Sequence, residues 1–175
     1  MGVRDSLERR CETGQRQVSN ALRMFSAAVA LLALLATAAA ARELKVYRKA
    51  GGSFDDVKFD LESAITNRGL VADFTGNVGA MLERTGKDVG STTNVYSRAQ
   101  YISFCSAKLS RDMMEADAAN AGFCPYIVFI YETVEKPGEI VVGYRRMPSS
   151  GNPRSVKAFD AINALIDGIA KEAVK

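Results

Sequence analysis

Beyond residue 42, apolar residues recur with the spacing of strands and helices in nine successive segments. Residues 43–49 alternate between apolar and polar side chains, which predicts a β-strand. In the next segment Ser53 is a suitable helix N-cap and Gly69 a suitable helix end. The apolar residues between these two positions share one helical face: Phe54, Val57, Leu61, Ala64 and Ile65.

The rest of the chain continues this alternation of strands and helices. A turn at "EKPGE" joins two strongly apolar runs, "CPYIVFIYE" and "IVVGYRRM", and predicts a β-hairpin. Ser110 is a candidate N-cap for the helix before that hairpin. In order, we expect a strand at 70–77, a helix at 78–86, a loop at 87–95, a strand around 101–105, a helix at 109–120, the hairpin strands at 124–132 and 140–147, and a final helix at about 155–174.

The predicted order is therefore β-α-β-α-β-α-β-β-α. Such an order predicts the α+β class, because the two hairpin strands are antiparallel and the helices are interspersed. We expect a two-layer sandwich with a mixed or mainly antiparallel sheet and its helices on one face. Residues 42–175 are predicted to form this single domain, since their length suffices for one hydrophobic core.

The first 41 residues have a different composition. Five arginines precede an uncharged, alanine-rich and leucine-rich run from Met24 to Ala41, which predicts a secretory signal peptide. Ala39 and Ala41 satisfy the small-residue rule, so we expect cleavage after Ala41 and export, most simply to a periplasm. The alternative is an N-terminal membrane anchor. The basic region is long for a leader, so Met24 is a second candidate for the start of the protein.

The net charge depends largely on this leader. The whole chain has 23 basic and 20 acidic residues, whereas residues 42–175 have 18 and 17. A nearly neutral domain gives no electrostatic reason to expect binding to nucleic acid. We also expect no membrane association once the leader is removed.

The chain contains no histidine. This excludes the serine and cysteine triads that use histidine as the base, and it excludes histidine-ligated zinc and haem. No pair of carboxylates is marked by its spacing as an acid and a base. We therefore expect no cofactor and no metal, and an enzyme is the less favoured interpretation.

Three segments resemble one known family: "AITNRGLVADFTGNVGAMLERTGKDVG", "YISFCSAKLSRDMMEADAANAGFCPYIVFIYE" and "VVGYRRM". They resemble the domain-of-unknown-function 302 family of small bacterial and archaeal proteins, over about residues 54–173. The resemblance implies an α+β fold. It implies no cofactor and no catalytic residue, because the family has no established activity.

Two cysteines remain beyond the leader, Cys105 at the end of one predicted strand and Cys124 at the start of a later one. An oxidising compartment favours a disulfide between them. Two buried, unpaired thiols and a redox or metal-binding pair are the alternatives. A bond requires the two strand ends to meet, which holds for antiparallel neighbours but not for parallel ones.

Other candidate side chains are basic or aromatic. Arg145 and Arg146, together with Arg84 and Lys87, are candidates for binding an anion, although solvated surface charges are the commoner explanation. Gly86-Lys87 does not match a phosphate loop, because that motif needs a Ser or Thr where Asp88 stands. Tyr101 and Tyr126 are candidates for lining a ligand pocket.

These observations favour an exported domain that binds a small molecule or a protein partner without catalysis. The alternative is a thiol-redox or thiol-dependent enzyme that uses Cys105 and Cys124. A homo-oligomer formed through an exposed sheet surface is a third expectation.

Overall fold

The computed structural model describes residues 43–175. The predicted signal peptide, the alternative membrane anchor and the second candidate start all lie outside the described residues. Within residues 43–175, no helix combines the length and the apolar character needed to cross a bilayer.

The described residues form five strands, four α-helices and two short 3₁₀ segments. Their bounds are β1 Leu44–Ala50, α2 Phe54–Thr66, β2 Ala72–Asn77, α3 Val78–Thr85, η1 Lys87–Val89, β3 Tyr96–Phe104, α4 Ala107–Ala116, η2 Ala118–Phe123, β4 Tyr126–Thr133, β5 Glu139–Arg145 and α5 Pro153–Glu172.

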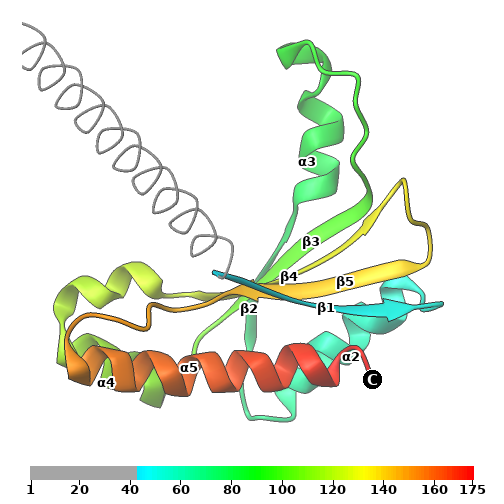
Figure 1. Ribbon diagram of the computed structural model, residues 1–175. Helices are drawn as coiled ribbons and strands as arrows, with labels where there is room; N and C mark the ends of the chain where they lie inside the picture. Colours follow the sequence, from blue (N-terminus) through cyan, green and yellow to red (C-terminus); the bar gives the residue numbers. More distant parts are fainter. Residues whose placement is uncertain (1–42) are drawn as a thin grey trace, which may run out of the picture. The chain divides into compact units, whose positions relative to one another are not determined.

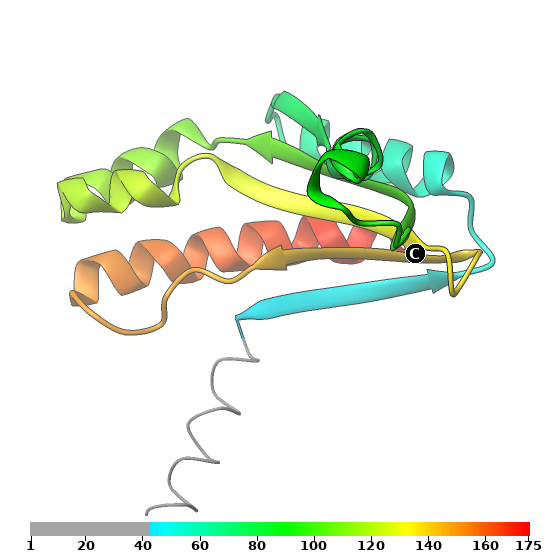
Figure 2. The same cartoon turned by 90° about the horizontal axis from the view of Figure 1, so that it is seen from above.

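The strands form one sheet in the order β1-β5-β4-β3-β2. Every neighbouring pair is antiparallel. The predicted α+β class and the predicted hairpin of β4 and β5 are confirmed, and the mixed sheet that we left open is not formed. Figure 2 shows the strands from one side of the sheet, with α5 behind them.

Three helices cover one face of the sheet. Helices α2, α4 and α5 lie on this side, whereas α3 stands off the opposite side (Figure 1). We refer to these as the inner and outer faces. The core lies between the sheet and the three helices, and its largest fully buried side chains include Tyr126, Tyr144, Phe104, Leu61 and Ile162.

Helix α3 departs from the prediction that all helices share one face. Strand β2 runs into α3 without a loop, and the Asn77 side chain caps the helix by accepting a hydrogen bond from the Ala80 N–H at 2.9 Å. A Cβ at Gly79 would lie only 3.0 Å from the Ala99 backbone nitrogen, so glycine allows the first turn of α3 to lie against β3.

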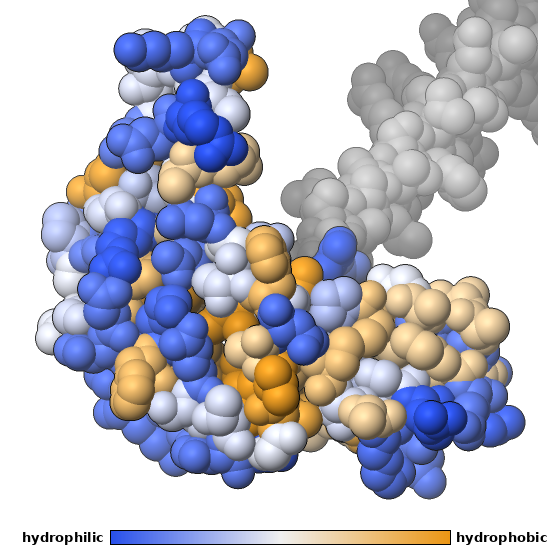
Figure 3. Space-filling view, turned by 180° about the vertical axis from the view of Figure 1, so that it is seen from behind, coloured by the Kyte–Doolittle hydropathy of each residue, from blue (hydrophilic) through white to orange (hydrophobic). Residues whose placement is uncertain are grey.

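The outer face of the sheet carries apolar side chains that solvent reaches. Leu44, Phe74 and Ile127 are each about half exposed. Tyr101 and Phe129 lie across glycines of the neighbouring strands, because a Cβ at Gly76 or Gly143 would collide with those rings. Figure 3 views the molecule from behind Figure 1, past the edge of the sheet, and there too apolar residues gather near the middle of the surface with hydrophilic residues around them.

Two local predictions need correction. Ser110 is not the N-cap of α4: the helix begins earlier, and Ser106 accepts the capping hydrogen bond from the Leu109 N–H. Ser110 instead lies within α4, and its side chain is buried. Strand β3 also begins at Tyr96, five residues before the predicted 101–105, because pairing with β4 extends through its polar N-terminal half.

Candidate functional site

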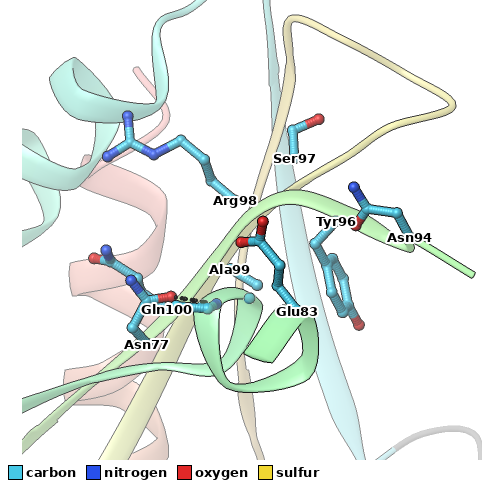
Figure 4. A pocket seen from close by; sticks show the side chains of 10 residues that line it. Asn77, Glu83, Asn94, Tyr96, Ser97, Arg98, Ala99 and Gln100 are labelled. Atoms are coloured by element: carbon cyan, nitrogen blue, oxygen red, sulfur yellow. Dashed lines mark hydrogen bonds between the residues drawn. The ribbon is translucent and has the colours of Figure 1, made fainter. Parts of the chain in front are cut away.

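A cavity of about 310 Å³ lies where β2 passes into α3 (Figure 4). Its volume falls at the lower end of the range typical of small-molecule sites. One wall comes from the end of β2 and the first turns of α3, and the other from the loop before β3 and the first half of β3. The lining residues are Asn77, Gly79, Ala80, Glu83, Asn94, Tyr96, Ser97, Arg98, Ala99 and Gln100.

Strand pairing explains why this cavity is open. The pairing of β2 with β3 ends at Asn77 and Gln100, so residues 96–99 of β3 extend past the last residue of β2. Helix α3 leaves the sheet at that point and rises beside the exposed part of β3 (Figure 1). The cavity therefore occupies the corner between a helix and an unpaired stretch of strand edge.

The side chains of the cavity are polar but mostly uncharged. Amides come from Asn77, Asn94 and Gln100, and a hydroxyl from Ser97. The Gln100 Oε1 atom is buried and has no hydrogen-bond partner among the described residues. A buried acceptor without a partner is unusual in folded proteins, and this oxygen, which has almost no accessible surface, does not face the cavity.

Arg98 also lines the cavity, but its charge is already neutralised. Its guanidinium donates two hydrogen bonds of 2.6 Å to the Asp55 carboxylate and lies 4.2 Å from the Phe54 ring centroid. The hydrogen bonds to Asp55 raise the pKa of Arg98 and lower that of Asp55. Both side chains are well exposed, so the pair contributes little to stability. It does hold Arg98 away from other anions.

The two cysteines form a second cluster, at the other end of β3. Cys105 follows β3 and Cys124 precedes β4, and these strands are antiparallel neighbours with Phe104 opposite Tyr126. The strand ends therefore meet, and the two Sγ atoms lie 2.7 Å apart without a bond. Both residues are partly exposed. Burial raises the pKa of the Cys105 thiol to about 11, with a further contribution from the neighbouring sulfur.

Ser110 and Tyr126 extend this cluster into the core. The Ser110 Oγ lies 2.9 Å from the buried Tyr126 hydroxyl and 3.8 Å from the Cys124 Sγ. Burial raises the pKa of Tyr126, whereas its hydrogen bond with Ser110 acts in the opposite direction. Two thiols and two hydroxyls are thus in contact around the start of β4.

Comparison with known proteins places the chain in a family. The model of the family described as "Domain of unknown function DUF302" matches residues 46–172. The chain belongs to the DUF302 family. One solved structure is that of an uncharacterized conserved DUF302 protein from Bacillus stearothermophilus, with 11% identity and a TM-score of 0.61. The similarity covers 77% of this chain and 99% of that one, and it supports the fold alone. No curated protein matches the sequence.

The basic residues that the sequence singled out do not form one cluster in this DUF302 domain. Arg84 and Lys87 lie in α3 and η1, beyond the end of β2. Arg145 and Arg146 lie at the opposite end of the sheet, where Arg145 is paired with Glu43 at 3.1 Å. Tyr101 is on the outer face and Tyr126 is buried in the core, so these tyrosines do not share a pocket.

A partly exposed ionic cluster around Asp167 was not predicted from the sequence. The Asp167 carboxylate on α5 accepts hydrogen bonds from the Tyr47 and Tyr144 hydroxyls and pairs with Lys45 at 2.6 Å and Lys171 at 2.7 Å. Burial alone would raise the pKa of Asp167, but these four donors hold it well below its usual range. Burial and the bond to Asp167 raise the pKa of Tyr144 to about 12.

The spacing of these residues in the sequence does not predict that they contact one another. Lys45 and Tyr47 occupy alternate positions of β1, and Tyr144 lies opposite Lys45 in β5. Asp167 is 120 residues from Tyr47 in the chain. All four contacts of the Asp167 carboxylate come from side chains of β1, β5 and α5, so the cluster explains how these elements pack together.

Proposed function

We propose that this DUF302 domain binds a small neutral ligand, rich in hydroxyl or amide hydrogen-bond donors, in the cavity between α3 and β3. The observation that carries the proposal is the set of uncharged polar side chains in the cavity wall, which are the amides of Asn77, Asn94 and Gln100 and the Ser97 hydroxyl. Amides and hydroxyls both donate and accept hydrogen bonds, so these groups can pair with several hydroxyl or amide groups of one neutral ligand.

The charges around the cavity select the class of ligand. Glu83 is the carboxylate in the lining and disfavours anions. Arg98, the cation in the lining, is held by Asp55 through two hydrogen bonds. The remaining polar groups are amides and a hydroxyl, which suit neutral polar molecules such as sugars, polyols and nucleosides. The Tyr96 ring supplies an aromatic surface at the same site.

Ligand-observed NMR with a panel of sugars, polyols and nucleosides, followed by calorimetry on each binder, tests the proposal. Asn94→Met replaces an accessible amide of the cavity lining by an apolar side chain. We expect it to weaken binding about fivefold to tenfold, as for the loss of one hydrogen bond to the ligand. Asn67→Met is the matched control, since Asn67 is an exposed amide outside the cavity. Absence of any binder, or equal affinity in both variants, would contradict the proposal.

We further propose that the protein is exported, as the composition of residues 1–41 indicates. Support comes from the uncharged run that ends in Ala39 and Ala41. Intact-mass measurement of the protein isolated from cells tests this directly. Cleavage after Ala41 leaves Arg42 as the first residue, and a chain that retains the leader would contradict export by cleavage.

A further inference from the structure

The pairing of β3 with β4 fixes the two cysteines against each other. Phe104 and Tyr126 are directly opposite in the antiparallel ladder. Phe104 immediately precedes Cys105, and Tyr126 is two residues after Cys124. Both rings are fully buried and pack edge to face, with centroids 5.8 Å apart. The backbone on both sides of the sulfur atoms is therefore anchored in the core. The sulfur–sulfur distance of 2.7 Å is a consequence of the sheet and not of a mobile loop.

The site is nevertheless reachable from solvent. Cys105 and Cys124 are both of intermediate exposure, whereas the Ser110 and Tyr126 hydroxyls beneath them are buried. A small molecule can therefore approach the sulfur atoms from outside.

We propose that Cys105 and Cys124 form a thiol–disulfide exchange site that reduces small organic disulfides and becomes an intramolecular disulfide. The proposal is independent of the ligand cavity at the other end of β3. It requires a substrate with an accessible S–S bond and no other oxidant, because that bond accepts both electrons.

The geometry allows a balanced two-step exchange. The Cys124 thiol loses its proton to solvent, and the thiolate attacks one sulfur of the substrate R–S–S–R. The S–S bond breaks, the first RS⁻ leaves and takes up a proton, and Cys124 carries a mixed disulfide. Cys105 then loses its proton and attacks the Cys124 sulfur, which releases the second RS⁻. Two protein thiols are oxidised, and one disulfide is reduced to two RSH.

The order of attack follows from the surroundings of the two sulfurs. The Ser110 Oγ lies 3.8 Å from the Cys124 Sγ and can donate to a thiolate formed there, so we assign the first attack to Cys124. Burial raises the pKa of Cys105, which agrees with a second role for that residue. Once the mixed disulfide forms, the fixed proximity of Cys105 compensates for its low thiolate fraction.

The test uses the full chain carrying Cys11→Ser, because Cys11 would add a third thiol. The reduced protein is mixed with oxidised glutathione and followed by mass spectrometry and by release of glutathione. We expect the loss of two hydrogens per chain and the release of two thiols. Cys105→Ser should stop at the glutathione adduct on Cys124. Cys124→Ser should react at least about tenfold more slowly, as the raised pKa of Cys105 implies.

Two results would overturn the proposal. One is a folded dithiol that does not react with oxidised glutathione while the same chain reacts in urea, since the thiols would then be inaccessible. The other is a stable adduct on the chain with both cysteines, since Cys105 would then fail to displace glutathione. Faster reaction of Cys124→Ser than of Cys105→Ser would reverse the assigned order. Circular dichroism establishes that each variant is folded.

Discussion

Oxidation of the Cys105–Cys124 pair should stabilise the domain, and the structure gives the size of the effect. The two residues are 19 positions apart in the chain, and the segment between them contains α4 and η2. Closing a loop of this length in the unfolded chain is worth roughly 3 kcal/mol in the chain-entropy model. The native state contributes little strain of its own, because the two sulfurs are already in contact in the reduced protein.

Thermal unfolding of the reduced and oxidised forms measures this effect. For a domain of about 130 residues, roughly 3 kcal/mol corresponds to a rise of about 10 °C in Tm. The control is the chain in which both cysteines are replaced by serine, treated with the same oxidant. Its Tm should not change on oxidation, whereas that of the parent should rise.

A Tm that is equal in the two forms, with the disulfide verified by mass spectrometry, would refute this reasoning. It would mean that the bond strains the folded state by as much as it restricts the unfolded chain. A lower Tm in the oxidised form would show that forming the bond strains the folded state by more than it restricts the unfolded chain.

Three further predictions concern stability. Ser110→Ala and Tyr126→Phe should each lower the free energy of unfolding by about 1 kcal/mol, because each change leaves a buried hydroxyl without its partner. The double variant should lose less than the sum of the two single losses. Urea titration measures the three values, and simple additivity would mean that the hydroxyls do not interact. Gly143→Ala should cost about 1–3 kcal/mol, since its Cβ would meet a ring carbon at 2.5 Å and a backbone oxygen at 2.6 Å, whereas Gly122→Ala, with open space, should be nearly neutral. Asp167→Asn should destabilise the domain above about pH 4 and less so in acid. The reason is that a carboxyl whose pKa is lowered in the folded state contributes stability that disappears as it is protonated. A loss of unfolding free energy that is constant from pH 7 to pH 2 would exclude this explanation.

The elements with strong local patterns could be predicted from the sequence. The hairpin of β4 and β5 follows from two apolar runs around "EKPGE", and α2 follows from its cap at Ser53, which the structure confirms. The antiparallel approach of Cys105 and Cys124 was one of two alternatives, and choosing between them needed the strand order. That order depends on contacts between distant segments, which periodicity does not encode.

The errors and omissions have physical causes of the same kind. Ser106 and Ser110 are equally suitable as N-caps by residue type. In the structure Ser110 is buried against the Tyr126 hydroxyl, and Ser106 is the N-cap. The cavity depends on where β2 stops pairing, and its lining combines Glu83 and Gln100 from different elements. No motif marks such a corner, because each of its amides is unremarkable by itself.

Strand β3 links the two proposed sites and also separates them. It begins at Tyr96 in the cavity wall and ends at Phe104, next to Cys105. At about 3.3 Å per residue the two ends are roughly 26 Å apart, and over its C-terminal half the strand is paired on both sides. Sites at this separation in a rigid sheet are expected to act independently. Ligand affinity should therefore be the same in the reduced and oxidised protein, and failure of either proposal leaves the other intact.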